Sequence, residues 1–106
     1  MMKIALLIAA TAALTIGTAS AGEPDESVGE SLYASSCAQC HGPGGKGMAS
    51  FPSLSGRDSD YIASRLMQYR DGERVGANSG LMIPNAAGLS DDDIANLAAY
   101  ISSEFQ

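Results

Sequence analysis

Apolar side chains recur at helical spacing in three segments of the chain, and each segment opens with a residue that often caps a helix. The first segment runs from Ser27 to about Ala38, the second from Asp58 to about Tyr69, and the third begins after Ser90. Beyond the first 21 residues, no segment alternates apolar and polar residues as a half-buried strand does. The pattern therefore predicts an all-α domain.

The apolar stripes of these three helices supply the expected core. A small residue in the first stripe would let another helix approach closely. We expect Asp71-Gly72 to end the second helix, and Ser90 to cap the third together with Asp93 in a variant of the capping box. In chain order, the stripe residues are Gly29, Leu32, Tyr33 and Ser36, then Ile62, Leu66 and Tyr69, then Ile94, Leu97, Tyr100 and Ile101.

Two segments show no period. Residues 42–55 are rich in Gly, Pro and Ser, which predicts a loop that wraps around something instead of forming a core of its own. Residues 74–89 also lack a helical or strand period and include Gly80 and Pro84. We expect a long irregular loop there, and such loops inside compact domains are usually functional.

The first 21 residues differ from the rest of the chain. Lys3 precedes an apolar run from Ile4 to Ile16, and Ala19-Ser20-Ala21 offers a small-x-small cleavage site. The run is shorter than the roughly 20 residues that a membrane-spanning helix needs. We expect residues 1–21 to be a signal peptide and residues 22–106 to form one exported domain in the periplasm.

Size and charge narrow the possibilities further. Removing 21 of the 106 residues leaves 85, enough for one domain but thin for a purely apolar core, so a large apolar cofactor would help. The formal charge of −6 argues against nucleic acid as a partner. Residues 91–93 are all aspartates at the start of a predicted helix, where they complement the helix dipole.

The string Cys37-Ala38-Gln39-Cys40-His41 matches the Cys-x-x-Cys-His pattern of covalent haem attachment. Two thiols three positions apart at the end of a helix can each add to one vinyl group of haem, and the next imidazole can then bind the iron. We predict one haem c per chain, covalently bound through Cys37 and Cys40, with His41 as the proximal ligand.

Three other interpretations of Cys37, Cys40 and His41 explain the sequence less well than haem attachment does. A thioredoxin-like dithiol would need a βαβ unit, and no strand is expected. A structural zinc site needs four ligands, whereas the chain has no further Cys or His. A disulfide between Cys37 and Cys40 would close a loop too short to constrain the unfolded chain much.

The sixth iron ligand cannot be another histidine of the same chain, because His41 is the only one. A methionine, a weaker donor or an open position remains. Met67 falls in a predicted helix, where methionine is most often core filler, and Met48 follows His41 too closely to reach the other side of the ring with ease. Met82, in the long loop, is the predicted distal ligand, since methionine and histidine together are a known haem ligand set.

With these residues in place, the chain from Ser27 to Ser103 resembles a class I cytochrome c of the small bacterial monohaem kind. The resemblance implies a cytochrome c fold of about three helices, the first and last crossing, with loops wrapped around the haem. It also implies that the carbonyl of Pro52 accepts a hydrogen bond from the proximal imidazole. The residues that carry it are Gly29, Tyr33 and Cys37, then Leu97 and Tyr100, then Phe51-Pro52-Ser53-Leu54, and the string from Met82 to Ser90.

A haem iron held by His41 and Met82 has no open position, which predicts electron transfer and no enzymatic activity. The expected function is that of a periplasmic electron carrier, a monomer that docks transiently on redox-partner proteins through its exposed haem edge, as the resemblance implies. One alternative is an electron-accepting haem subunit of a periplasmic dehydrogenase or sulfur-compound-oxidising complex. Another, less favoured, is a gas sensor or haem enzyme with an open sixth position.

Overall fold

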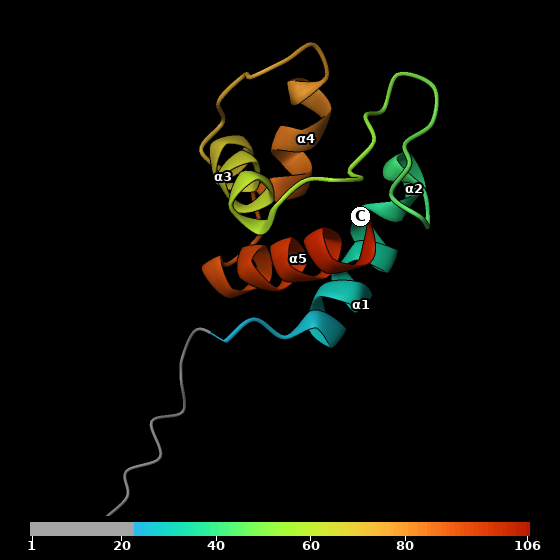
Figure 1. The fold of residues 1–106 in the computed structure, drawn as a ribbon. Helices are drawn as coiled ribbons and strands as arrows, with labels where there is room; N and C mark the ends of the chain where they lie inside the picture. The colour runs from blue at the N-terminus through green and yellow to red at the C-terminus, as the bar shows by residue number, and fades with distance from the viewer. Residues whose placement is uncertain (1–22) are drawn as a thin grey trace, which may run out of the picture.

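The structure, a computed structural model, describes residues 23–106 and contains five helices in this range (Figure 1). In chain order they are α1 (Glu26–Ser36), α2 (Ala38–His41), α3 (Ser59–Arg70), α4 (Ser79–Ala86) and α5 (Asp91–Glu104). Within residues 23–106, one isolated bridge between Met48 and Phe51 is the only strand-like pairing. The predicted all-α class is confirmed, whereas the expected signal peptide lies outside the described residues.

No helix in the described part of the chain combines the length and the apolar character that crossing a bilayer requires. The first and last helices instead cross each other at Gly29 of α1. A Cβ atom added to Gly29 would lie 2.8 Å from Cβ of Tyr100 and closer still to the carbonyl oxygen of Asn96. The small residue therefore allows the close approach of α1 and α5 that the sequence predicts.

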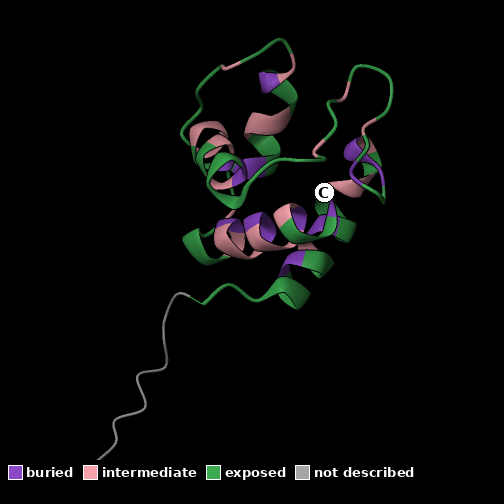
Figure 2. Ribbon diagram, viewed as in Figure 1, coloured by how far each residue is buried: buried purple, intermediate pink, exposed green. Residues whose placement is uncertain are grey.

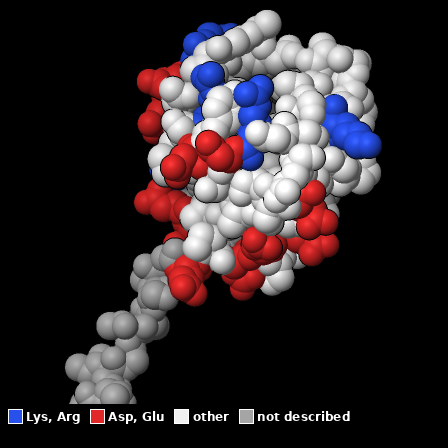
Figure 3. All heavy atoms as spheres, in the orientation of Figure 1, with Lys and Arg blue, Asp and Glu red and all other residues white. Residues whose placement is uncertain are grey.

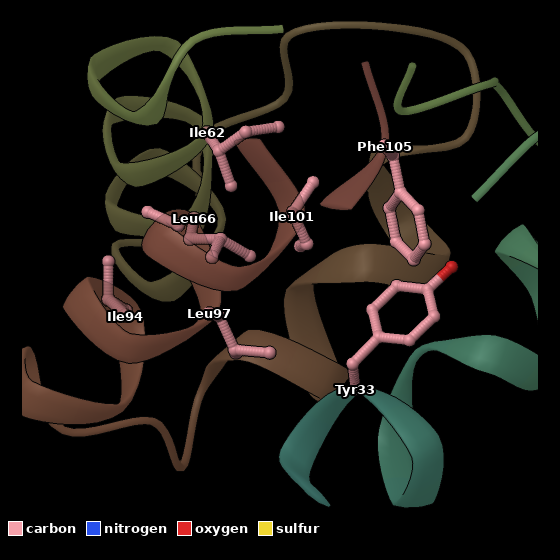
Figure 4. Packing of buried hydrophobic residues seen from close by; sticks show 8 residues of the cluster. Tyr33, Ile62, Leu66, Ile94, Leu97, Ile101 and Phe105 are labelled. Carbon is pink, nitrogen blue, oxygen red and sulfur yellow. The ribbon is translucent and has the colours of Figure 1, made fainter. Parts of the chain in front are cut away.

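Side chains from α1, α3 and α5 meet in one apolar core (Figure 4). The rings of Tyr33, Tyr100 and Phe105 pack together with centroids 5.0 to 5.7 Å apart. Figure 2 shows that the buried positions of the three helices lie on the sides that face one another. The buried cluster consists of Tyr33, Ile62, Leu66, Ile94, Leu97, Ala98, Ile101 and Phe105.

The ends of the long helices follow the sequence signals. Asp58 caps α3 and Ser90 caps α5, each accepting a backbone N–H with its side-chain oxygen. Ser90 and Asp93 form the predicted reciprocal capping box. At the other end of α3, Asp71 is followed by Gly72, whose φ of 81° favours glycine.

Residues 74–89 do not form the irregular loop that the sequence pattern predicts, because they contain α4. This helix includes Gly80 and also Pro84, which has no N–H to donate to a carbonyl one turn earlier. Ser79 is 2% exposed, and its hydroxyl accepts the backbone N–H groups of Val75 and Gly76, both at 2.9 Å. Those hydrogen bonds and packing against α3 stabilise a helix that its own sequence favours little.

Candidate haem-binding site

A cavity with two adjoining lobes, of about 250 and 110 Å³, is bounded by parts of all five helices and by the loop between α2 and α3. Most of the side chains on its walls are apolar, so an apolar group would gain free energy by entering it. The two lobes share Cys37, His41, Pro52, Leu66, Tyr69, Met82 and Leu97.

Both thiols of the attachment motif lie on the cavity wall. The first helix ends at Ser36, two residues before the predicted limit, and Cys37 leads into the single turn of α2. The N–H of His41 donates to the carbonyl of Cys37 at 3.0 Å, which holds the motif in a helical turn. Cys37 borders both lobes and Cys40 borders the larger one, and both are free thiols.

The thiol of Cys37 is poorly suited to redox catalysis. Its burial, with a smaller contribution from the neighbouring Cys40, raises the pKa of the Cys37 thiol to about 11. Reactive dithiols instead use a cysteine whose pKa is lowered so that the thiolate forms near neutral pH. The environment of Cys37 therefore argues against a thioredoxin-like dithiol.

One nitrogen of the His41 ring is already engaged. Nδ1 lies 2.9 Å from the carbonyl oxygen of Pro52, and the side chain is buried, with 7% exposed. A carbonyl oxygen only accepts hydrogen bonds, so Nδ1 must carry the proton in this contact. The lone pair of Nε2 is then left available on a side chain that borders both lobes.

The loop from residue 42 to 55 brings Pro52 back to His41. The N–H of Gly47 donates to the carbonyl of His41 at 2.8 Å, and that of Leu54 to Gly45 at 2.7 Å. Gly47 has a φ of 77°, and a Cβ atom there would lie 2.9 Å from the carbonyl carbon of Pro52. Glycine at this position therefore permits the fold of the loop that places the Pro52 carbonyl beside the imidazole.

Met82 is the one methionine in residues 23–106 that borders the cavity. It lies on α4, is half-buried, touches the apolar core and lines both lobes. Met48, in the loop, is 46% exposed, and Met67, on α3, is 40% exposed; neither lines a lobe. Of the three candidates from the sequence, only Met82 shares the cavity with His41.

The family model described as cytochrome c matches residues 27–104. This chain belongs to the cytochrome c family. It is a haem-bearing electron carrier of the small class I bacterial kind, and its haem c is covalently bound.

Two relatives match the cytochrome over nearly their whole length. It is 46% identical to cytochrome c-554(548) of Halomonas halodenitrificans over 89 residues, which cover 83% of this chain and 98% of the relative. It is 40% identical to cytochrome c-554(547) of Halothiobacillus neapolitanus over 87 residues, covering 74% and 96%. A thiosulfate dehydrogenase electron acceptor of Stutzerimonas stutzeri is 38% identical over 68 residues, covering 63% of this chain and 32% of that protein.

The residues around the cavity of the cytochrome fit a covalent haem. They offer two free thiols, an imidazole with one available nitrogen, and a thioether, all on the walls of one mainly apolar space. Within residues 23–106, no cluster of three or more His, Cys, Asp or Glu side chains could hold a metal ion by itself. The donor set therefore suits an iron porphyrin.

Sequence reasoning missed the residues that join α4 to the rest of the site. Nδ2 of Asn78 donates to the carbonyl of Ser50 at 2.8 Å, and both residues border the larger lobe. The buried Ser79 follows directly and holds the start of α4. The pair Asn78-Ser79 consists of residues that often begin helices, and this was the available signal.

Proposed function

We propose that Cys37 and Cys40 hold the haem through thioether bonds and that His41 and Met82 are its two axial ligands. The observation that carries this proposal is that His41, with Nε2 available, shares the cavity with Met82 and with no other described methionine. The hydrogen bond from His41 to Pro52 is the kind that orients a ligating imidazole and strengthens its free nitrogen as a ligand.

We infer from this ligand set that the protein is an electron carrier and not an enzyme. The bound iron supplies the reversible exchange of one electron. The residues of the chain keep His41 in one tautomer, present a soft thioether that favours ferrous iron, and surround both with apolar walls that exclude water. With His41 and Met82 both bound to the iron, no position would be left for a substrate.

We further propose that residues 1–21 are a signal peptide and that residues 22–106 work in the periplasm as a monomer with transient redox-protein partners. The charged, apolar and small-residue regions in residues 1–21 support export. The exposed large apolar residues favour transient docking, because they are spread over four parts of the fold: Val28 on α1, Met48 in the loop, Tyr61 and Met67 on α3, and Leu81 on α4.

A permanent subunit of a redox complex is the second candidate. It is favoured by the similarity to a relative that is named as the electron acceptor of thiosulfate dehydrogenase, of which this chain covers 32%. A permanent subunit should co-purify with a stable partner and bury a large apolar surface against it. Isolation of the protein alone from its native periplasm would contradict this second candidate.

The optical spectrum of the ferric protein tests the ligand set. Wild type is produced in cells with haem-attachment machinery. It should show the weak far-red band of ferric haem whose iron is bound by a methionine sulfur, and Met82→Ala should lose this band. The matched control Met67→Ala, at an exposed position away from the cavity, should keep the band. The intact mass of the same preparation should equal residues 22–106 plus one haem.

A wild-type spectrum without this band would contradict the proposed methionine ligand. If wild type lacks the band and its ferrous form binds carbon monoxide freely, the sixth position is open, and sensing or catalysis must replace electron carriage.

A further inference from the structure

Phe105 is buried although it lies just beyond the last turn of α5. The helix ends at Glu104, and Phe105 is 6% exposed. Its ring packs against the rings of Tyr33 and Tyr100, with centroids 5.0 and 5.5 Å away, and Figure 4 shows it beside the ring of Tyr33. The residue that follows α5 is therefore held in place by the aromatic part of the core.

The ring of Phe105 also meets the loop between α2 and α3. Gly45 of this loop is buried, and a Cβ atom added to it would lie within 2.8 Å of three atoms of the Phe105 ring. Gly45 has a φ of 67°, a conformation that favours glycine. The absence of a side chain at this position therefore lets the ring rest on the backbone of the loop.

The backbone of Phe105 holds the same loop at a second point. Its carbonyl accepts the N–H of Gly56 at 2.8 Å. Phe105 thus contacts Gly45 through its ring and Gly56 through its carbonyl, and Pro52 lies in the segment between these two glycines. One residue therefore restrains both ends of the segment from 45 to 56.

Hydrogen bonds within this segment extend the restraint to Pro52. The carbonyl of Gly45 accepts the N–H of Leu54 at 2.7 Å and the hydroxyl of Ser53 at 3.4 Å. Both donors directly follow Pro52, whose carbonyl oxygen lies 2.9 Å from Nδ1 of His41. The position of Gly45 therefore bears on the hydrogen bond that orients the imidazole.

Phe105 has no direct access to the cavity. It lines neither lobe, so a change at this position leaves the walls of the cavity in place. It is also uncharged. In the view of Figure 3, Lys and Arg lie on the upper half of the surface, and Asp and Glu lie along the left edge and the lower half. Substitution of Phe105 alters none of these charges, so its effect on the iron must pass through the loop.

We propose that Phe105 is a positioning residue that sets the strength of the hydrogen bond between His41 and Pro52, and through it the reduction potential of the haem. This hydrogen bond makes the imidazole a stronger donor to iron, which favours the ferric state. A weaker hydrogen bond should therefore raise the reduction potential. The inference rests on the proposed ligation of iron by His41.

The first test compares Phe105→Ala with Ile94→Ala, its matched control. Ile94 lies at the other end of α5, is fully buried in the same core and lines neither lobe. Both substitutions remove a buried apolar side chain and should lower the free energy of unfolding. The decisive measurements are the reduction potential, by optical titration, and the resonance of the Nδ1–H proton of His41, by NMR of the ferrous protein.

Only the substitution of Phe105 should change these two quantities. Phe105→Ala should raise the reduction potential and move the Nδ1–H resonance of His41 upfield, as a weaker hydrogen bond does. Ile94→Ala should match wild type in both measurements despite its lower stability. Phe105→Leu, which keeps an apolar side chain against Gly45, should lie between wild type and Phe105→Ala.

The second test approaches the same contact from the loop. Gly45→Ala should also raise the potential, because its Cβ atom would push the loop away from the ring of Phe105. Gly72→Ala is the control, since Gly72 has a similar φ of 81° and an added Cβ atom there meets nothing within 4 Å. In the double variant of Gly45 and Phe105 to alanine, the shift should be smaller than the sum of the two single shifts.

The contrary result is specific to this proposal. If Phe105→Ala and Gly45→Ala lose stability but keep the wild-type potential and Nδ1–H resonance, Phe105 serves only the packing of the core and the proposal is wrong. If Phe105→Ala does not mature, Phe105→Leu and Gly45→Ala decide the question with the same measurements. A wild type without the far-red band would overturn the proposed ligand set instead, so the two failures are distinguishable.

Discussion

The hydroxyl of Tyr33 links the core to the haem site through a single contact. Tyr33 is 2% exposed, and its hydroxyl donates at 2.5 Å to the carbonyl of Gly42, the residue that follows the attachment motif. The ring also packs against Tyr100 and Phe105. One side chain therefore fixes both the apolar packing of α1 and the exit of the chain from His41.

Replacing Tyr33 with phenylalanine should keep the packing and remove the hydrogen bond. We expect the free energy of unfolding of Tyr33→Phe to fall by about 1 kcal/mol at pH 7, measured by chemical denaturation of the haem-bearing protein. Tyr61→Phe is the control, because Tyr61 is 38% exposed and should change the same quantity by less than about 0.5 kcal/mol.

Alkaline pH gives this prediction a second measurement. Burial raises the pKa of Tyr33 to about 12, against about 10 in the unfolded chain. The folded state thus holds the phenol proton more tightly, so this contribution to stability is complete below about pH 10 and is lost as the pH rises through about 12. Wild type should lose stability more steeply than Tyr33→Phe between these values; equal slopes would contradict the assignment.

At the scale of helices, the crossing of α1 and α5 depends on the absence of a side chain. Gly29→Ala adds a methyl group that meets the carbonyl group of Asn96 and Cβ of Tyr100. Alanine favours a helix more than glycine does, yet we expect the variant to be about 1 to 3 kcal/mol less stable, because α5 must move. Chemical denaturation measures the change.

The matched control for this crossing is Gly88→Ala, where an added Cβ atom meets nothing within 4 Å. It should leave the free energy of unfolding close to that of wild type. If Gly29→Ala proves as stable as Gly88→Ala, then α1 and α5 tolerate a wider separation than the structure has.

The helices differ in how far their sequences predict them. Ile94, Leu97 and Ile101 recur at helical spacing because one face of α5 is buried, so periodicity identified both the helix and its core face. The eight residues of α4 have no such period, and Pro84 favours a break. Contacts with residues distant in sequence hold this helix, and a local pattern does not contain them.

The same distinction applies to the site. The attachment motif was predictable because covalent chemistry fixes the spacing of Cys37, Cys40 and His41. The hydrogen bond from Asn78 to Ser50 was not predictable, because it depends on how a loop and a helix pack in space. Met82 was reached by elimination and by resemblance, although its segment was expected to be a loop.

At the scale of the whole molecule, one hydrogen bond joins the two parts of the chain that bound the larger lobe. Asn78, at the start of α4, donates to the Ser50 carbonyl in the loop that carries Pro52. This hydrogen bond therefore joins the helix that carries Met82 to the loop that follows His41. It adds to the contacts that both segments make with the apolar core.

Removing this bridge should loosen the proposed distal ligand. In Asn78→Ala, we expect cyanide to bind the ferric haem about fivefold faster than in wild type, because a lost hydrogen bond of about 1 kcal/mol lets Met82 leave the iron more often. Stopped-flow mixing measures the rate. Ser50→Ala keeps the carbonyl acceptor and should behave as wild type; an unchanged rate in Asn78→Ala would mean that the bridge does not restrain Met82.

The packing of α1 against α5 also bears on the order in which the parts of the chain fold. The N–H of Asp25 and the side chain of Asn96, which bond at 2.7 Å, are 71 positions apart, and contacts of that range form late because a long loop must close first. The docking of α5 on α1 is therefore expected to be a late step of folding, one that follows the formation of the local turn between Cys37 and His41.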